Sequence, residues 1–209
     1  KELLPFHSIP DELAYSLDIA QLFATVVDTK SPFTYRHSRG VAAIAGFMGE
    51  QSGFSPGHCT YLEIAGLLHD LGKLAVPNEL LEKPGKLSVA EFNMMKQHAY
   101  YTYWLLKPIP ENFPLAEWAA YHHEKPNGKG YPFTKKAMEL DLSTRLLSIA
   151  DIFVALREDR PYRNSMGWEQ IAKIMNEQAQ LDGLDKKQIP IILDNQKLLD
   201  QKWEELSER

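Results

Sequence analysis

Cysteine is almost absent from this sequence. Cys59 is the only one among 209 residues, so the chain cannot form an internal disulfide, and this scarcity is typical of a reducing compartment. Long apolar runs are absent too: none approaches the ~20 residues that span a bilayer, and no signal peptide is visible. We therefore expect a cytoplasmic chain that makes no membrane contact. Because the chain begins at Lys1 and not at Met, we also expect a fragment of a longer protein, from which a sensory or membrane-anchoring part could have been removed.

Positive charge is not in excess. The chain carries 23 Lys and Arg against 28 Asp and Glu, a formal net charge of −5. General DNA- or RNA-binding proteins are usually basic, so this balance argues against that class. The negative net charge does not exclude a small anionic ligand that binds in a locally basic or metal-lined pocket. The hydrophobic fraction of 44% is that of an ordinary globular protein.

Strand-like alternation and internal repeats are also missing, whereas apolar residues recur at helical spacing over most of the chain. We therefore predict an all-α fold. Ser88 and Glu91 have the spacing of a capping box at the start of one helix. Residues 1–30 are expected to form an N-terminal helical extension, and residues 31–209 the main domain. The helices are predicted over residues 11–28, 35–51, 60–71, 89–106, 113–124, 141–156, 168–180 and 186–205.

Several histidines and aspartates lie beside apolar runs, where an unpaired charge is costly. They are His37, His69, Asp70, His98, His122, His123 and Asp151. Imidazole and carboxylate together suit Zn, Fe, Mn, Co or Ni, whereas a thiolate site would need cysteines that this chain lacks. Seven candidates exceed the four ligands of one structural zinc and match two metals that share a carboxylate.

Each of these residues also has a simpler interpretation. A buried histidine is more often a core residue satisfied by a hydrogen bond than a metal ligand. For His37 alone the two interpretations are balanced. His7 and His58 lie in loops and are predicted to be exposed, and Glu124 is predicted to be a solvated charge at a helix end.

The polar residues belong to motifs that follow one another in order along the chain. These are HDLGK at residues 69–73, PNELLEKPGKL at 77–87, KQH at 96–98, HHEKPNGKGYP at 122–132, IAD at 149–151 and DRPYR at 159–163. The ordered set resembles the HD superfamily of metal-dependent phosphohydrolases, and within it the HD-GYP subfamily of cyclic di-GMP phosphodiesterases. The resemblance covers about residues 31–174 and implies an HD-type helical bundle with a dimetal site among its central helices.

The resemblance also implies ligand sets for two divalent metals, most often iron or manganese in such proteins, with cobalt, nickel or zinc as alternatives. One metal would be held by His37, His69, Asp70 and Asp151. The other would be held by Asp70, His98, His122 and His123, so that Asp70 bridges the two. Some relatives bind a third metal through a glutamate four residues before the first histidine. Because Phe33 stands there, we do not expect a third metal held in this way.

The implied activity is hydrolysis of cyclic di-GMP to pGpG or GMP, by in-line attack of a metal-activated hydroxide with Asp70 among the catalytic residues. Lys73 would reach the phosphate as a point charge. Arg160 and Arg163 match positions that contact ligand, although each could instead be a solvated charge or pair with a carboxylate. Tyr131 could stack against the substrate or simply fix its turn.

Two departures from the family pattern affect these expectations. Asn127 replaces a usual Asp in the Gly-Tyr-Pro loop and can make the same Asx-type bond to backbone. Val154 replaces an Asp that can contact the nucleotide, so base recognition can differ and 3′,3′-cyclic GMP-AMP is an alternative substrate. A further alternative is a non-catalytic sensor that binds a cyclic dinucleotide or a partner such as a diguanylate cyclase domain. A regulatory domain and a homodimer also stay open as partners.

Overall fold

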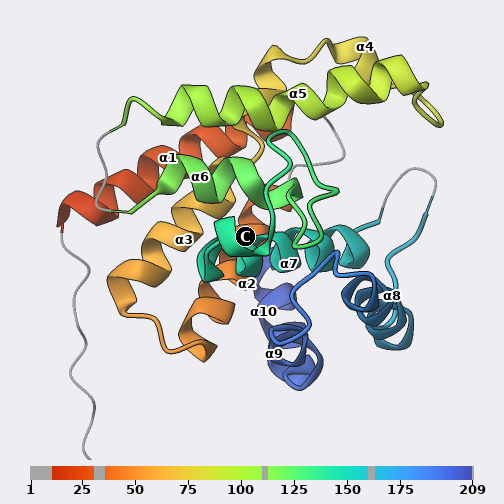
Figure 1. The fold of residues 1–209 in the computed structure, drawn as a ribbon. Coiled ribbons are helices and arrows are strands. Elements are labelled where there is room, and N and C mark those ends of the chain that lie inside the picture. The colour runs from red at the N-terminus through yellow and green to blue at the C-terminus, as the bar shows by residue number, and fades with distance from the viewer. Residues whose placement is uncertain (1–10, 31–35, 110–112, 160–162, 209) are drawn as a thin grey trace, which may run out of the picture.

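Helices make up the regular secondary structure of this chain in its computed structural model, which describes residues 11–30, 36–109, 113–159 and 163–208. These ranges contain no β-strand, so the all-α prediction is confirmed (Figure 1). The α-helices are α1 (Asp11–Thr29), α2 (His37–Gln51), α3 (Pro56–Leu68), α4 (Asn78–Leu81), α5 (Val89–Leu106), α6 (Leu115–Ala120), α7 (Leu142–Arg157), α8 (Trp168–Gln180), α9 (Ile189–Leu193) and α10 (Gln196–Glu208). The 3₁₀ helices are η1 (Leu71–Ala75), η2 (Tyr121–His123) and η3 (Ala137–Glu139).

Helix α2 lies at the centre of the bundle and packs on α3 and α7. Its residues Val41, Ile44 and Met48 recur at helical spacing and are fully buried. The approach of α3 to α2 depends on Gly66, because a Cβ atom there would lie 2.7 Å from the Cα of Ala42. The backbones of the two central helices therefore pack directly on each other.

Helix α1 packs along α3, and its residues Ala20, Ala24 and Val27 belong to the same hydrophobic core. Just after α1, the ammonium of Lys30 donates hydrogen bonds to carbonyl oxygens at the end of η1, at distances of 2.7 to 3.1 Å. The division at residue 30 stays a prediction, since the junction at residues 31–35, including Phe33, lies outside the described residues.

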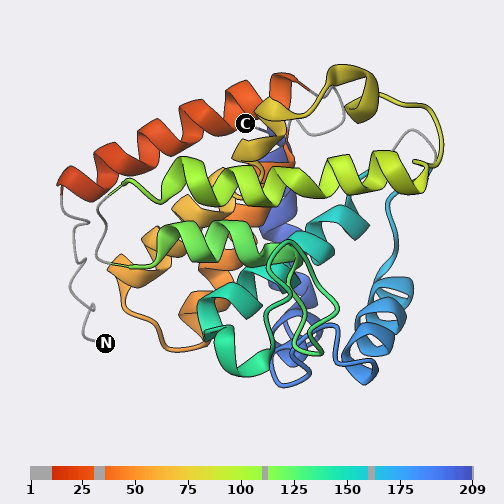
Figure 2. The same ribbon diagram turned by 45° about the horizontal axis from the view of Figure 1, so that its top comes forward.

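Helix α5 crosses directly over η1, as both views of the ribbon allow the reader to follow (Figures 1 and 2). A Cβ atom at Gly72 would lie 1.9 Å from the carbonyl oxygen of His98, so only glycine fits there. The hydroxyl of Thr102 accepts a hydrogen bond from the Gly72 N–H and donates one to the His69 carbonyl. These contacts place the start of η1 beside the middle of α5.

Most predicted helices are present, and the capping box of Ser88 and Glu91 is confirmed. The predicted extents of three helices were wrong. The helix expected at 60–71 starts at Pro56, after an N-cap at Ser55, and ends at Leu68. The helix expected at 113–124 ends at Ala120 and continues as η2, and that expected at 186–205 is two helices, α9 and α10, separated at residues 194–195.

The prediction that His58 is exposed was also wrong. Its ring stacks against Phe54 and Trp118 at centroid distances of 3.9 and 4.9 Å, and its Nε2 lies 2.8 Å from the Ser143 hydroxyl. The cause is the earlier start of α3, which places His58 in a helix and not in a loop. His7 lies outside the described residues. Within the described ranges, no helix is long and apolar enough to cross a membrane.

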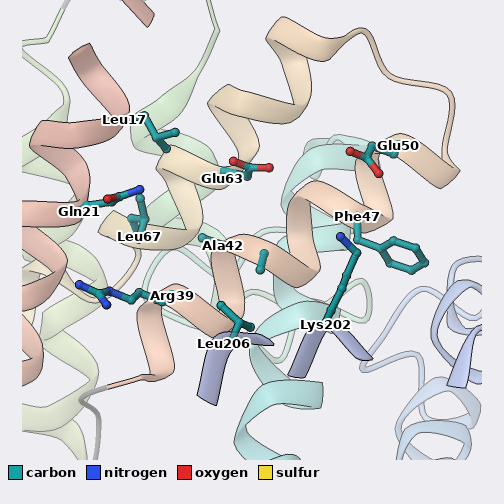
Figure 3. A pocket seen from close by; sticks show the side chains of 11 residues that line it. Leu17, Gln21, Arg39, Ala42, Phe47, Glu50, Glu63, Leu67, Lys202 and Leu206 are labelled. Carbon is teal, nitrogen blue, oxygen red and sulfur yellow. The ribbon is translucent and has the colours of Figure 1, made fainter. Parts of the chain in front are cut away.

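A cavity of about 350 Å³ lies on the face of α2 that is turned away from His37, between α1, α3 and α10. Figure 3 shows Glu50 and Glu63 along one side of this cavity and Arg39 and Lys202 along the other. Burial, reinforced by the charge of Glu50 and opposed by that of Lys202, raises the pKa of Glu63 to about 7. None of the site residues predicted from the sequence lines this cavity.

We expect Gly66→Ala to lower the free energy of unfolding by roughly 1–3 kcal/mol, because the added methyl group must separate α2 from α3. Urea unfolding followed by circular dichroism measures this. The matched control is Gly57→Ala, near the start of α3, where no atom lies within 4 Å of the added Cβ. An equal loss of stability in both variants would contradict the close-approach argument.

We expect Glu63→Gln to stabilise the protein in a pH-dependent way. The pKa of Glu63 is higher in the folded chain, about 7, than its ordinary value of 4.5. Its stabilising contribution is therefore complete below about pH 4.5 and is lost as the pH rises through about 7. The variant should gain roughly 1–3 kcal/mol over the wild type near pH 8 and almost nothing near pH 4.5, by urea unfolding at both values. A pH-independent difference, or the same gain in the exposed control Glu79→Gln, would refute the assignment.

Candidate metal centre

Asp70 lies at the junction between α3 and η1, and its carboxylate is buried between two groups of histidines. His69 caps the C-terminal end of α3, and Asp70 immediately precedes η1. The Oδ2 atom of Asp70 lies 3.2 Å from His69 Nε2, and its Oδ1 atom lies 3.4 Å from His98 Nε2. Each carboxylate oxygen therefore faces a different histidine group.

The first group brings together His37 from α2 with His69 and Asp70. One possible ligand atom of each lies within 4.8 Å of those of the others, and all three residues are buried. Asp151 from α7 joins them, since its Oδ1 lies 3.1 Å from His37 Nε2 and 4.0 Å from His69 Nε2. The consecutive helices α2 and α3 and the distant helix α7 thus supply this group.

The second group consists of His98 from α5 and the adjacent His122 and His123 from η2, again with ligand atoms within 4.8 Å of one another. The 3₁₀ turn that follows α6 lets both neighbouring rings face the same region. The Nε2 atoms of His98 and His122 lie 3.4 Å apart. Two unprotonated ring nitrogens at this distance repel each other unless a proton or a cation lies between them.

In four of the histidines the Nδ1 atom has a hydrogen-bond partner. The Nδ1–H groups of His69, His98 and His122 each donate to a carbonyl three residues earlier, at 2.6, 2.7 and 2.6 Å. The Nδ1 atom of His37 instead lies 3.1 Å from the Glu158 carboxylate. A hydrogen bond at Nδ1 fixes the ring orientation and leaves Nε2 available, which is how metal-binding histidines are usually held.

Burial also favours the neutral form of the second group. It lowers the pKa of His98 and of His122, and it lowers the pKa of His123 to about 3, with the neighbouring rings adding to the effect. Burial therefore favours the unprotonated form of these three imidazoles. Only an unprotonated ring nitrogen can bind a metal.

The carboxylates of the site stay ionised in spite of their burial. Burial would raise the pKa of Asp70, but Lys73 and His69 hold it well below its ordinary value. Hydrogen bonding and the charge of His37 likewise hold the pKa of Asp151 far below normal. Against burial, Asp151 and Glu158 raise the pKa of His37 to about 9, so in this arrangement a proton lies between His37 and Asp151.

The donor set fits divalent metals. Five imidazoles and two carboxylates face one region, with no thiolate among them, and the nearest ligand-atom pairs are 3.1 to 3.4 Å apart. Neighbouring ligands of one cation are separated by about 3 Å when each lies about 2.1 Å from it. A cation between His37 and Asp151 would take the place of the proton there. The position of Asp70 between the two groups is the one that a bridging carboxylate needs.

Two of the four predicted substrate-contacting residues, Lys73 and Tyr131, lie beside the histidine groups. Lys73 Nζ is 2.5 Å from Asp70 Oδ2, and the Tyr131 ring lies 4.7 Å from the His123 ring between centroids. Arg163 Nη2 donates to the carbonyl of Ala155, so this arginine braces the end of α7. Arg160 lies outside the described residues.

Two buried glutamates were missed or misjudged from the sequence. Glu158, which bonds His37, lies in a charged run that reads as a solvated loop, but it follows Asp151 by seven residues and therefore shares its helix face. The prediction that Glu124 is solvated was wrong. It is 2% exposed, and its carboxylate accepts hydrogen bonds from the N–H groups of Phe133 and Lys135. It closes the loop that follows His123.

The structure shows the contacts of Asn127 and Val154, the two residues that depart from the family pattern. The Asn127 side chain accepts a hydrogen bond from the Lys129 N–H, which confirms the Asx-type turn, and donates another to the Leu181 carbonyl. Val154 is fully buried, and its side chain packs against Gly40 of α2. Its side chain therefore belongs to the hydrophobic core.

Comparisons with known proteins agree with this architecture. A family model described as HD domain matches residues 21–187. The chain is 37% identical over 179 residues to 3′3′-cGAMP-specific phosphodiesterase 1 of Vibrio cholerae, covering 86% of this chain and 42% of that protein. It is 35% identical over 163 residues to a cyclic di-GMP phosphodiesterase of Thermotoga maritima, covering 76% and 43%. The chain thus spans less than half the length of these curated relatives.

Solved structures give the same result. A cyclic GMP-AMP-specific phosphodiesterase of Vibrio cholerae is 35% identical, with a TM-score of 0.55 over 88% of this chain and 41% of that one. An HDG"Y"P protein of Bdellovibrio bacteriovorus has a TM-score of 0.67 over 90% and 64%, and at 17% identity it supports the fold alone. The family match and the curated relatives show that the chain belongs to the HD domain family, and its ordered motifs are those of the HD-GYP subfamily.

Proposed function

We propose that this chain is a metal-dependent phosphodiesterase that hydrolyses cyclic di-GMP to pGpG, to GMP or to both. The observation that carries the proposal is that the Nε2 atoms of His37, His69 and His98, each on a ring held at Nδ1, lie 3.1 to 3.4 Å from a carboxylate oxygen of Asp70 or Asp151. The names of the relatives add support, since they are phosphodiesterases of cyclic di-GMP or of 3′3′-cGAMP.

In this proposal the site holds two divalent cations. His37, His69, Asp70 and Asp151 hold one, and Asp70, His98, His122 and His123 hold the other. We propose that the two cations are iron or manganese. Cobalt, nickel and zinc are alternatives, because the same ligand atoms accept them. When bound, the two cations supply an activated water for in-line attack and stabilise the charge that develops on the phosphoryl oxygens.

The surrounding side chains orient the substrate. Lys73 lies at the half-buried edge of the site, within reach of a phosphate that approaches Asp70, and its ammonium offsets negative charge there. The Tyr131 ring lies 4.7 Å from the His123 ring between centroids, where it is proposed to stack against the substrate or to fix its turn. Arg160 is proposed as a further ligand contact. For Arg163 the bond to Ala155 favours a bracing role in place of the predicted contact with ligand.

A second candidate substrate is 3′,3′-cyclic GMP-AMP. It is favoured by two relatives named for 3′3′-cGAMP, at 37% and 41% identity. We further propose that the chain acts in the cytoplasm, under the control of a regulatory domain or of a partner such as a diguanylate cyclase domain.

The activity is tested by incubating the protein, purified without oxygen and analysed for metals, with a panel of cyclic dinucleotides and separating the products by chromatography. We expect turnover of cyclic di-GMP or of 3′,3′-cyclic GMP-AMP, and the ratio of kcat/KM values decides between them. Chelation should abolish turnover, and Asp70→Asn should lower kcat by at least about 100-fold together with metal content. The exposed control Glu79→Gln should match the wild type. Absence of turnover with iron, manganese, cobalt and nickel would refute the proposal.

We also predict that Glu158 positions His37 for its cation. Glu158→Gln keeps the shape of the side chain but removes the charge that orients the imidazole, so metal affinity should fall about 10- to 100-fold. Competition with a chelating dye measures this affinity directly, without reference to turnover. Glu169→Gln, an exposed substitution of the same kind on α8, is the control. Unchanged affinity in Glu158→Gln would show that the contact with His37 is merely structural.

A further inference from the structure

Asp28, near the end of α1, is a buried carboxylate that is not among the proposed metal ligands. It is 2% exposed, and its Oδ1 atom accepts a hydrogen bond of 3.0 Å from the hydroxyl of Ser38. Ser38 is fully buried and directly follows His37 at the start of α2. A single hydrogen bond therefore joins Asp28 to the neighbour of a proposed ligand.

Further hydrogen bonds fix the end of α1 relative to the metal centre. Just after this helix, the ammonium of Lys30 donates to three carbonyl oxygens at the end of η1. Asp70 immediately precedes η1, and Asp28 is bonded to the first turn of α2. The end of α1 therefore contacts the two segments that carry His37 and Asp70.

The charge of Asp28 interacts with the first group of proposed ligands. Burial raises the pKa of Asp28 to about 6, and the hydrogen bond from Ser38 and the charge of His37 oppose this rise. The charge of Asp70 raises the same pKa further, and that of His69 lowers it. An asparagine would accept the Ser38 hydrogen bond without the cost of a buried charge. The hydrogen bond alone therefore does not account for a carboxylate at this position.

Bound metals would account for it. Two divalent cations bring more positive charge than the two ligand carboxylates, Asp70 and Asp151, can offset. Metal ions are the largest local charges of such sites, and charges attract strongly in a buried region because the interior screens them weakly. Glu158 supplies further negative charge from beside His37 without being a proposed ligand. Asp28 is a second buried carboxylate of this kind.

We propose that Asp28 is a charge-compensating residue of the metal centre, whose carboxylate, held by Ser38 beside His37, stabilises the cation of the first group. This role rests on the proposed function only through the two-cation site, and it does not depend on which cyclic dinucleotide is the substrate. The buried charge of Asp28 is then unfavourable in the metal-free protein and becomes favourable when the cation binds.

Asp28→Asn tests the proposal, because the amide keeps an oxygen that can accept the Ser38 hydrogen bond and removes the charge. In competition with a chelating dye for manganese or cobalt, one of the two cations should bind about 10- to 100-fold more weakly, and the other should change little. Asp18→Asn, the same substitution at an exposed position of α1, should match the wild type. Unchanged affinity in Asp28→Asn beside a wild type that binds two cations would overturn this role alone. A wild type that binds neither metal would overturn the proposed metal centre as well.

Urea unfolding of the metal-free proteins separates the effect of charge from a loss of structure. At pH 8, metal-free Asp28→Asn should be at least as stable as the wild type, because it no longer buries a charge. Weaker metal binding together with lower stability would make the role of Asp28 structural and overturn the proposal. Ser38→Ala keeps the charge and removes the hydrogen bond, so it should lose less metal affinity than Asp28→Asn. A larger loss in Ser38→Ala would assign the effect to the hydrogen bond and refute the role of the charge.

Discussion

The contact of Asp70 with two histidine groups is the constraint on which the site depends. One oxygen faces His69 and the other faces His98, so α3 and α5 must lie close enough for a single carboxylate to reach both. That approach requires Gly72, where any side chain would collide with the His98 carbonyl, and it is held by the hydroxyl of Thr102. The packing of α5 on η1 therefore requires the glycine of the HDLGK motif. Lys73 is the next residue of η1, so the same packing brings it close to Asp70.

The buried histidines and aspartates would be strongly destabilising without partners, and the way they are satisfied defines their function. Each fixed imidazole uses one nitrogen for a backbone carbonyl or for Glu158, and directs the other inward. In the region between the histidine groups, hydrogen-bond acceptors therefore outnumber donors. The clearest case is the pair of Nε2 atoms of His98 and His122, which face each other. Divalent cations resolve that imbalance better than protons do, because burial lowers the pKa of His98, His122 and His123.

Sequence alone predicted the features that depend on local pattern. The all-α fold and α5 with its capping box follow from periodicity and end signals, and the grouping of seven candidate ligands followed from the order of the motifs. It failed where the outcome depends on distant contacts. Periodicity over residues 113–124 could not reveal the turn at η2, and the burial of Glu124 depends on N–H groups nine and eleven residues later. The bond from Arg163 to the Ala155 carbonyl of α7 is a distant contact of the same kind, and the predicted contact of Arg163 with ligand stays a prediction.

The bonds of Lys30 connect the outer surface of the molecule to the site. Its ammonium donates to the carbonyls of Lys73, Leu74 and Val76, so the end of α1 is tied to the segment that begins at Asp70. Any movement of the end of α1 would therefore be transmitted to η1 and to Lys73. Such a movement would act on this site through the position of Lys73 and not through His69, His98 and His122, whose rings are fixed independently by their own Nδ1 bonds.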